Sequence, residues 1–230
     1  MKNTFAVLTL LFMVPVAADD HVAIVKEAFS NISNDYHHEW AFTQSTLEDD
    51  VHIVQRYDPR SPDDHRWKLI TVDGRVPTAD EIAEYQDDEQ DDFHDSDNDD
   101  DSDMVNFETL SLIEETNEYW LFRFTPDVGE DEDETARKFM QQVDGTIRIS
   151  RDGNYVSYID LRNVGPIRPA FSVKISSFST HLTFGPAGDG GPVVPLSIDV
   201  AVKGRAMLFV TFDELESIRY SDYENVSRRY

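Results

Sequence analysis

The feature that most constrains the fold is a two-residue alternation of apolar and polar side chains that dominates the chain after Gly145. Its clearest run has apolar residues at every even position from Val194 to Val202. Because successive side chains of a strand point to opposite faces, such a run predicts a strand with one buried and one solvated face. Asp152-Gly153, between two such runs, is a strong signal for a β-hairpin. The alternation therefore predicts an antiparallel sheet for the second half of the chain.

The same reasoning predicts about eleven strands in the whole chain. The expected strands cover residues 39–46, 51–57, 66–72, 107–114, 118–125, 145–151, 154–162, 171–184, 194–202, 206–212 and 217–223. Within 171–184 the apolar residues change from odd to even positions, which predicts a β-bulge near Ser176-Ser177. Lys203-Gly204-Arg205 is expected as a turn, and residues 206–212 as a strand that is covered on both faces.

Three segments have helical spacing instead. Residues 22–32 predict an amphipathic helix that packs on the domain as a lid, and residues 136–143 predict another. A third helix is expected to begin at Thr78, because Thr78 and Glu81 have the spacing of a capping box. The chain is therefore expected to be α+β and mostly β, with a long bent sheet that must either close on itself or be covered.

The first eighteen residues have the pattern of a secretory signal peptide. Lys2 precedes the apolar run Phe5–Val14, and Val16 and Ala18 are the small residues that signal peptidase reads before a cleavage site. The apolar run is too short to cross a bilayer, which takes ~20 residues. Cleavage after Ala18 would leave residues 19–230 as a single domain in the periplasm, with no transmembrane segment.

The chain has a formal net charge of −26, and much of this charge is local. Residues 80–103 hold fourteen carboxylates with no Lys or Arg, and residues 127–134 hold six more. Repulsion among the carboxylates and a shortage of apolar side chains predict a solvated, disordered loop over residues 87–103. The negative charge argues against binding to nucleic acid or to anionic lipid headgroups.

No residue pattern predicts a metal site, a cofactor or a catalytic centre. Residues 95–99 imitate the start of a calcium loop, but the glycine and the final glutamate of that loop are missing, so an acidic spacer is favoured over a calcium site. The seven histidines are scattered, and the chain has no cysteine for zinc binding or thiol catalysis. No Gly-x-Ser-x-Gly motif is present, and hydrolase chemistry would need perturbed ionisable groups in one pocket. We therefore expect no enzyme.

Large apolar side chains on the predicted strands are the candidate ligand-binding residues. Any one of them is an ordinary core residue by default. As a set on a curved sheet with few helices, they are candidates to line an apolar cavity. The candidates are Trp40, Phe42, Trp67, Leu69, Trp120, Phe122, Phe124, Phe171, Phe178 and Leu182.

Several short stretches carry a family resemblance. They are Trp67–Glu81, with Val72-Asp73-Gly74 and Pro77-Thr78, then Val143–Ile149 continued by Tyr155–Asn163, then Pro166–Pro169, and finally Tyr220–Tyr223. These stretches resemble the periplasmic LolA-like superfamily, which includes outer-membrane lipoprotein-sorting carriers and related sensors of the sigma-factor regulatory branch. The resemblance implies an unclosed antiparallel half-barrel of about eleven strands, with two or three helices that cover a cavity for acyl chains.

Together, these features lead to the hypothesis of an exported periplasmic protein that binds an apolar ligand, such as an acyl chain or lipid, without catalysis. The alternative hypothesis is an envelope sensor or interaction module that uses the same fold to bind a protein partner. In that alternative the acidic residues 87–103 would increase the rate of association with the partner.

Overall fold

The computed structural model describes residues 18–33, 36–62, 65–92, 104–129, 134–188, 190–207 and 210–227. The strands in these residues are β1 (Trp40–Glu48), β2 (Val51–Tyr57), β3 (Trp67–Val72), β4 (Ser111–Glu115), β5 (Tyr119–Phe124), β6 (Val143–Ser150), β7 (Tyr155–Asn163), β8 (Ile167–Ala170), β9 (Val173–Pro186), β10 (Val193–Ala206) and β11 (Val210–Asn225).

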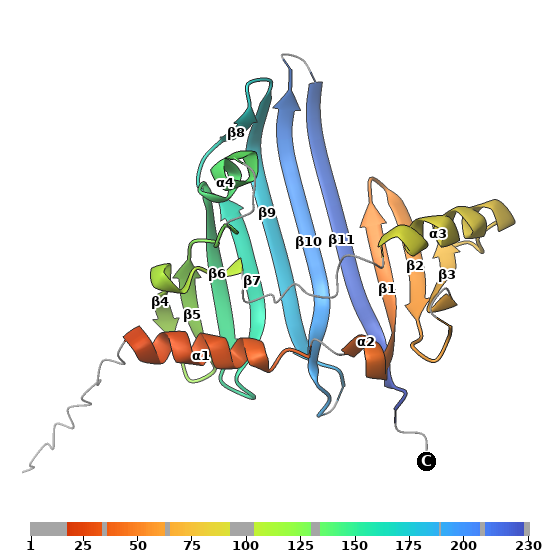
Figure 1. Cartoon of the computed structure of the whole chain (residues 1–230), viewed down its shortest axis with the longest axis horizontal. Helices are drawn as coiled ribbons and strands as arrows, with labels where there is room; N and C mark the ends of the chain where they lie inside the picture. Colours follow the sequence, from red (N-terminus) through yellow and green to blue (C-terminus); the bar gives the residue numbers. More distant parts are fainter. Residues whose placement is uncertain are drawn as a thin grey trace, which may run out of the picture.

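Within the described residues, the eleven strands form one antiparallel sheet (Figure 1). The strand order is β3-β2-β1-β11-β10-β9-β7-β6-β5-β4, and β8 pairs with β9 outside this path. The end strands β3 and β4 do not pair with each other, so the sheet is not closed. The predicted fold class is confirmed: the chain is mostly β, with an unclosed antiparallel sheet and a few short helices.

The helices of the described residues pack on one face of the sheet, which we call the helical face; the opposite face is called the polar face. The helices are α1 (Ala18–Ser30), α2 (Tyr36–Glu39), α3 (Ala79–Asp92) and α4 (Glu134–Met140). Phe29 of α1 packs in the main core, and the ring of Phe139 in α4 lies 4.9 Å from the ring of Phe178 in β9. On α3, the Tyr85 hydroxyl donates a hydrogen bond of 2.6 Å to Gln55 of β2.

One row of directly opposed residues runs across the whole sheet on the helical face. From β4 to β3 this row, called the apolar row, consists of Leu112, Phe122, Ile147, Ile159, Leu182, Ile198, Ile218, Thr46, Ile53 and Val72. Only Thr46 is polar. The neighbouring row on the polar face includes Arg148, Tyr158, Thr183, Ser197 and Arg219. The two rows show the expected alternation of a buried and a solvated face.

Three local predictions are confirmed. Gly153, in the turn between β6 and β7, has a φ of +84°, which suits glycine in a hairpin turn. The amide of Thr78 donates to Glu81 at 2.8 Å and the amide of Glu81 donates to Thr78 at 3.3 Å, which is the capping box of α3. In β9, Ile175 and Ser177 oppose consecutive residues of β10, so the residue between them is bulged where a bulge is predicted.

The C-terminal strands differ from the prediction. β10 continues through Lys203-Gly204-Arg205, where a turn is predicted, and β11 is one strand, where two are predicted over 206–212 and 217–223. Gly204 lies under the ring of Phe212, with which a Cβ atom would collide, so this glycine permits close packing instead of a turn. The apolar run 206–212 therefore includes the end of a hairpin and is not a covered strand. β8 was not predicted.

Helix α3 extends further into the acidic region than the sequence predicts. The backbone of α3 continues to Asp92, whereas residues 87–92 are predicted as loop. The capping box and an ion pair of 2.6 Å between Arg75 and Glu81 hold its first turn, and extending a formed helix costs less than starting one. Residues 93–103, and residues 1–17 of the predicted signal peptide 1–18, lie outside the described residues. Among the described helices, none combines the length and apolar character needed to cross a membrane.

The fold predicts a large cost for removing the ring of Phe122, which is fully buried. Phe122→Ala is expected to lower the free energy of unfolding by about 3–5 kcal/mol, measured by urea denaturation. The neighbouring Arg123 is exposed, so Arg123→Ala is the control and is expected to change it by less than about 0.5 kcal/mol. Equal effects of the two substitutions would contradict the assigned faces of β5.

Candidate functional site

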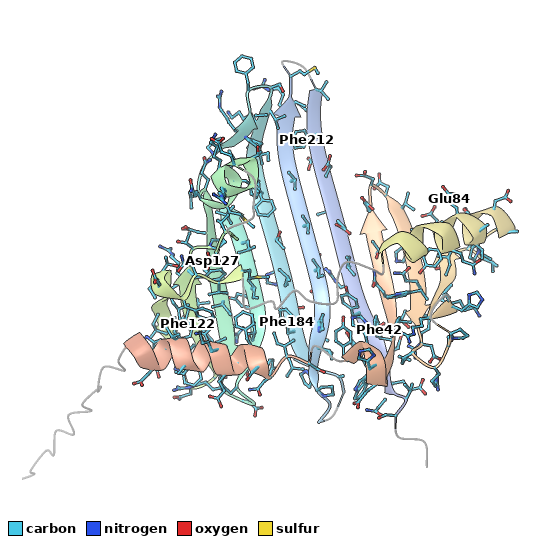
Figure 2. All side chains as sticks on the ribbon, viewed as in Figure 1. Phe42, Glu84, Phe122, Asp127, Phe184 and Phe212 are labelled. Atoms are coloured by element: carbon cyan, nitrogen blue, oxygen red, sulfur yellow. The ribbon has the colours of Figure 1, made fainter. Side chains whose placement is uncertain are left out.

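In the described part of the chain, the ten candidate residues do not line one cavity. Five of them, Trp120, Phe122, Phe124, Phe178 and Leu182, belong to the main hydrophobic core or pack against it. Phe42, Trp67 and Leu69 lie on β1 and β3, on the other side of the central strands. Figure 2 shows Phe122 and Phe42 towards opposite ends of the sheet. Trp40 and Phe171 belong to neither group.

The first group is occupied by packing within the protein. Phe122 and Phe124 are fully buried, and Val25 and Phe29 of α1 are buried in the same core. Phe178 is packed edge to face against α4. Phe122 and Phe124 therefore stabilise the fold and are not open to a ligand, whereas Phe178 and Leu182 are only half-buried.

The second group is the centre of an aromatic cluster on the helical face. The ring of Phe42 is fully buried and lies 5.1 Å from Tyr57, 5.5 Å from Trp67 and 5.9 Å from Tyr220. The cluster also contains Tyr36, His37 and Tyr223. Aromatic pairs at these distances stabilise one another by about 0.5–1.5 kcal/mol beyond the area they bury. This cluster is the core of the β1–β3 end of the sheet.

Burial in this cluster keeps two phenols neutral. Desolvation, with a smaller contribution from the nearby Glu216 carboxylate, raises the pKa of Tyr220 to about 12. Burial also raises the pKa of Tyr223, whose hydroxyl donates a hydrogen bond of 2.6 Å to the carbonyl oxygen of Pro195. Both residues are therefore uncharged parts of the core at neutral pH.

Trp40 and Phe171 lie apart from these groups. Trp40 lines a cavity of about 250 Å³ together with Ser33, Glu39, Ala187, Gly190, Gly191, Pro192 and Asn225. A second cavity, of about 150 Å³, is lined by Asp127, Val128, Gly129, Ala136, Phe139 and Met140. Both are smaller than the ~300–1,000 Å³ that is typical of small-molecule sites. Phe171 is predicted on a strand but lies fully exposed in the turn between β8 and β9.

Among the described residues, helices cover the helical face least over the middle of the sheet. Figure 1 shows α1 and α4 towards the β4–β9 side and α2 and α3 towards the β1–β3 side, and no described helix lies over most of β10 and β11. Thr180 lies on this face opposite Val200, but most of the other side chains there are half-buried and apolar. We call them the central strip: Phe178, Leu182, Ile198, Val200, Val202 and Ile218.

Three carboxylates border the central strip. Glu216 and Glu214 of β11 lie directly opposite Val200 and Val202, and Glu48 of β1 lies directly opposite Glu216. None of the three has a Lys or Arg partner in the part of the chain that the structure describes. Like charges opposite each other on neighbouring strands are unfavourable, so the border combines apolar surface with uncompensated negative charge.

The polar face holds the polar pairs that could support catalysis. A hydrogen bond of 2.8 Å joins Nδ1 of His181 and the carboxylate of Asp160. His181 lies between Asp160 and Asp199, which are on the two neighbouring strands. Ser45 and His52 form a second pair at 2.7 Å. His181 and His52 are four strands apart, or ~19 Å, so the two pairs cannot combine into one triad. Among the described residues, no group of three His, Cys, Asp or Glu side chains could hold a metal ion.

Neither histidine pair is predicted from the sequence. The Ser45–His52 pair could be predicted from nearby residues, because the two-residue turn Asp49-Asp50 fixes the register of β1 and β2. The Glu48–Glu216 contact has no such signal, since it depends on pairing between the first strand and the last.

No protein-family model matches the chain, and neither a curated protein nor a solved structure matches it. Of what the sequence resemblance implies, the described residues therefore show only an unclosed, eleven-stranded antiparallel sheet.

Tyr220→Phe is expected to make stability less sensitive to alkaline pH. The phenol has a pKa of about 12 in the folded chain and ~10 when unfolded, so its contribution is complete below pH ~10 and is lost as the pH rises towards the folded value. Urea midpoints measured from about pH 8 to about pH 12 should fall less steeply in the variant. An identical alkaline loss in both proteins would contradict the assigned environment of Tyr220.

Proposed function

We propose that the protein is an exported carrier that holds the alkyl chain of a neutral or cationic amphiphile on the central strip. The observation that carries the proposal is the central strip itself, an apolar surface that the described helices leave half-exposed. The signal-like N-terminus supports export to the periplasm. The ligand would lie on the helical face, on the opposite side of the sheet from the Ser–His and Asp–His pairs, and no bond is broken.

The shape of the central strip suits an extended chain. From the pair Ile198–Ile218 to the pair Val202–Phe178 the strip covers four residues of a strand, or ~13 Å. Further along β10 and β11, Gly204 opposes Phe212 and continues the same face. Burying apolar surface here would contribute ~25 cal/mol per Å², which is the main source of affinity for a hydrocarbon chain.

The acidic border restricts the head group. An anionic head group placed about 4 Å from Glu214 or Glu216 would be repelled by about 1 kcal/mol per carboxylate in water, and more strongly near the protein surface. A cationic head group would gain a similar amount. The carboxylates therefore favour a neutral or cationic amphiphile over a fatty-acid anion.

Val200→Gln is expected to weaken binding of dodecyltrimethylammonium about tenfold, which corresponds to ~1.4 kcal/mol. The substitution places an amide in the middle of the central strip, where Val200 is half-buried. The matched control is Ala201→Gln, since Ala201 is also half-buried and lies next in the chain on the polar face. Isothermal titration calorimetry below the micellar concentration measures the affinity, and urea midpoints of both variants show whether folding is affected.

The Val200 experiment also distinguishes the carrier function from the function of an interaction module. If neither a cationic nor a neutral dodecyl amphiphile binds the unaltered protein, the carrier function is wrong. Equal weakening by Val200→Gln and Ala201→Gln would place binding elsewhere. Retention of a cross-linked envelope protein, with no amphiphile binding, would support the sensor or interaction module.

The double substitution Glu214→Gln and Glu216→Gln tests the head-group preference. It is expected to weaken binding of dodecyltrimethylammonium by roughly tenfold and to leave binding of the neutral dodecyl maltoside unchanged, because only the charge at the border is removed. Glu118→Gln, in the exposed turn before β5, is the control. An equal loss for both ligands would show that the carboxylates matter for packing and not for head-group choice.

A further inference from the structure

Three large apolar side chains of the described residues lie at the projecting end of the long strands; we call them the tip. Phe171 is fully exposed, Met207 is 73% exposed and Val210 is 57% exposed. Phe171 and Met207 lie in two neighbouring turns, which are joined by a hydrogen bond from the amide of Met207 to the carbonyl oxygen of Ser172, and Val210 is the first residue of β11. Figure 1 shows this end of β9, β10 and β11 extending beyond the rest of the sheet. The tip therefore presents apolar surface away from the core.

Positive charge lies immediately behind the tip. At this end of the sheet, the last residue of β10, Ala206, pairs with Val173 of β9 and with Val210 of β11. The next pair towards the core is Lys174 of β9 directly opposite Arg205 of β10. Two cations opposite each other on neighbouring strands repel. Within the described residues, neither has a carboxylate partner. This pair would be stabilised by an anion that approaches the tip from outside.

The order of apolar side chains at the tip and cations behind it matches the order of acyl chains and phosphates at a lipid surface. One residue of a strand rises ~3.3 Å, so the two cations lie close behind the apolar tip. Interfacial proteins bury apolar side chains ~5–10 Å into the boundary between headgroups and acyl chains and keep Lys and Arg at the level of the phosphates. Both requirements are met by Phe171 and Met207 together with Lys174 and Arg205.

A protein partner fits this end of the molecule less well. A stable protein interface needs ~800 Å² on each partner. The tip is three strands wide, which is ~10 Å from the first to the third, and among the described residues its large exposed apolar side chains are Phe171, Met207 and Val210. A narrow apolar projection with cations behind it can insert into a fluid bilayer without needing a complementary partner surface.

The large negative charge of the whole chain does not prevent this contact. At physiological ionic strength, charges are screened beyond ~8 Å. Headgroups at the tip therefore interact more strongly with Lys174 and Arg205 than with distant carboxylates. The negative charge disfavours contact with anionic lipids for the chain as a whole, whereas the fold separates Arg205 from Glu214 of the acidic border by three residues along the strands.

We propose that the tip is a membrane-contact site, which inserts Phe171 and Met207 into a phospholipid bilayer while Lys174 and Arg205 contact anionic headgroups. The site goes beyond the proposed carrier function and does not depend on it, because lipid contact at the tip needs no ligand on the central strip. The two are connected on the helical face, where Phe212 lies on β11 between the central strip and Val210 (Figure 2).

Vesicle co-sedimentation tests the site, using the chain without its first eighteen residues, whose apolar run would itself bind lipid. The probe is a vesicle of phosphatidylcholine with phosphatidylglycerol, compared with phosphatidylcholine alone. Phe171→Ser with Met207→Ser is expected to weaken binding to both vesicles by at least about tenfold. Lys174→Gln with Arg205→Gln is expected to weaken binding by about thirtyfold to the anionic vesicle only. Leu215→Ser, at a residue of β11 that is 54% exposed on the polar face, is the control and should bind normally.

A labelling experiment locates the contact directly. The chain has no cysteine, so Met207→Cys gives a single attachment point for an environment-sensitive fluorophore. Vesicles should shift its emission to the blue, and the same label at Leu215→Cys should not respond. Failure of the unaltered protein to bind either vesicle, or an equal response at both positions, would overturn the proposal. A vesicle-independent change in oligomeric state caused by the serine substitutions would also overturn it, by identifying the tip as a self-association surface.

Discussion

The apolar row across the helical face is the constraint on which the rest of the structure depends. It includes one residue from nearly every strand, and each residue lies directly opposite the next. Because side chains alternate along a strand, a shift of one residue in any pairing would turn that strand's apolar side chains towards solvent. The row therefore fixes the register of the sheet, and the same register places Arg148, Tyr158 and Arg219 on the polar face. The fold and the distribution of charge have one physical origin.

The length of the helices determines where this row stays open. α1 has 13 residues, so it is ~20 Å long and can cross about four strands spaced ~4.8 Å apart. It covers the β4–β7 end, and the aromatic cluster around Phe42 fills the β1–β3 end. The middle strands β10 and β11 are left with half-buried Val200, Val202 and Ile218. An extended sheet with short helices thus exposes apolar surface without any defect in its core.

Local features could be predicted from the sequence, but the location of the candidate site could not. The alternation after Gly145, the hairpin at Gly153 and the capping box at Thr78 each depend on a few adjacent residues, and each is found. The apolar run 206–212 has the composition of a buried strand, yet it includes the end of a hairpin, because β10 continues past Gly204 under the ring of Phe212. Phe122 and Phe171 are the same residue type, and only the position of α1 and of the β8–β9 turn makes one a core residue and the other fully exposed.

The central claim is that hydrocarbon binds the middle of the helical face. Methyl-labelled protein can be titrated with dodecyltrimethylammonium, and nuclear Overhauser contacts between the alkyl chain and the protein methyl groups can be measured. We expect contacts with Ile198, Val200 and Ile218 and none with Leu121 or Val54, which lie on the polar face. Binding with contacts confined to Leu121 and Val54, or binding without any contact to Val200, would contradict it.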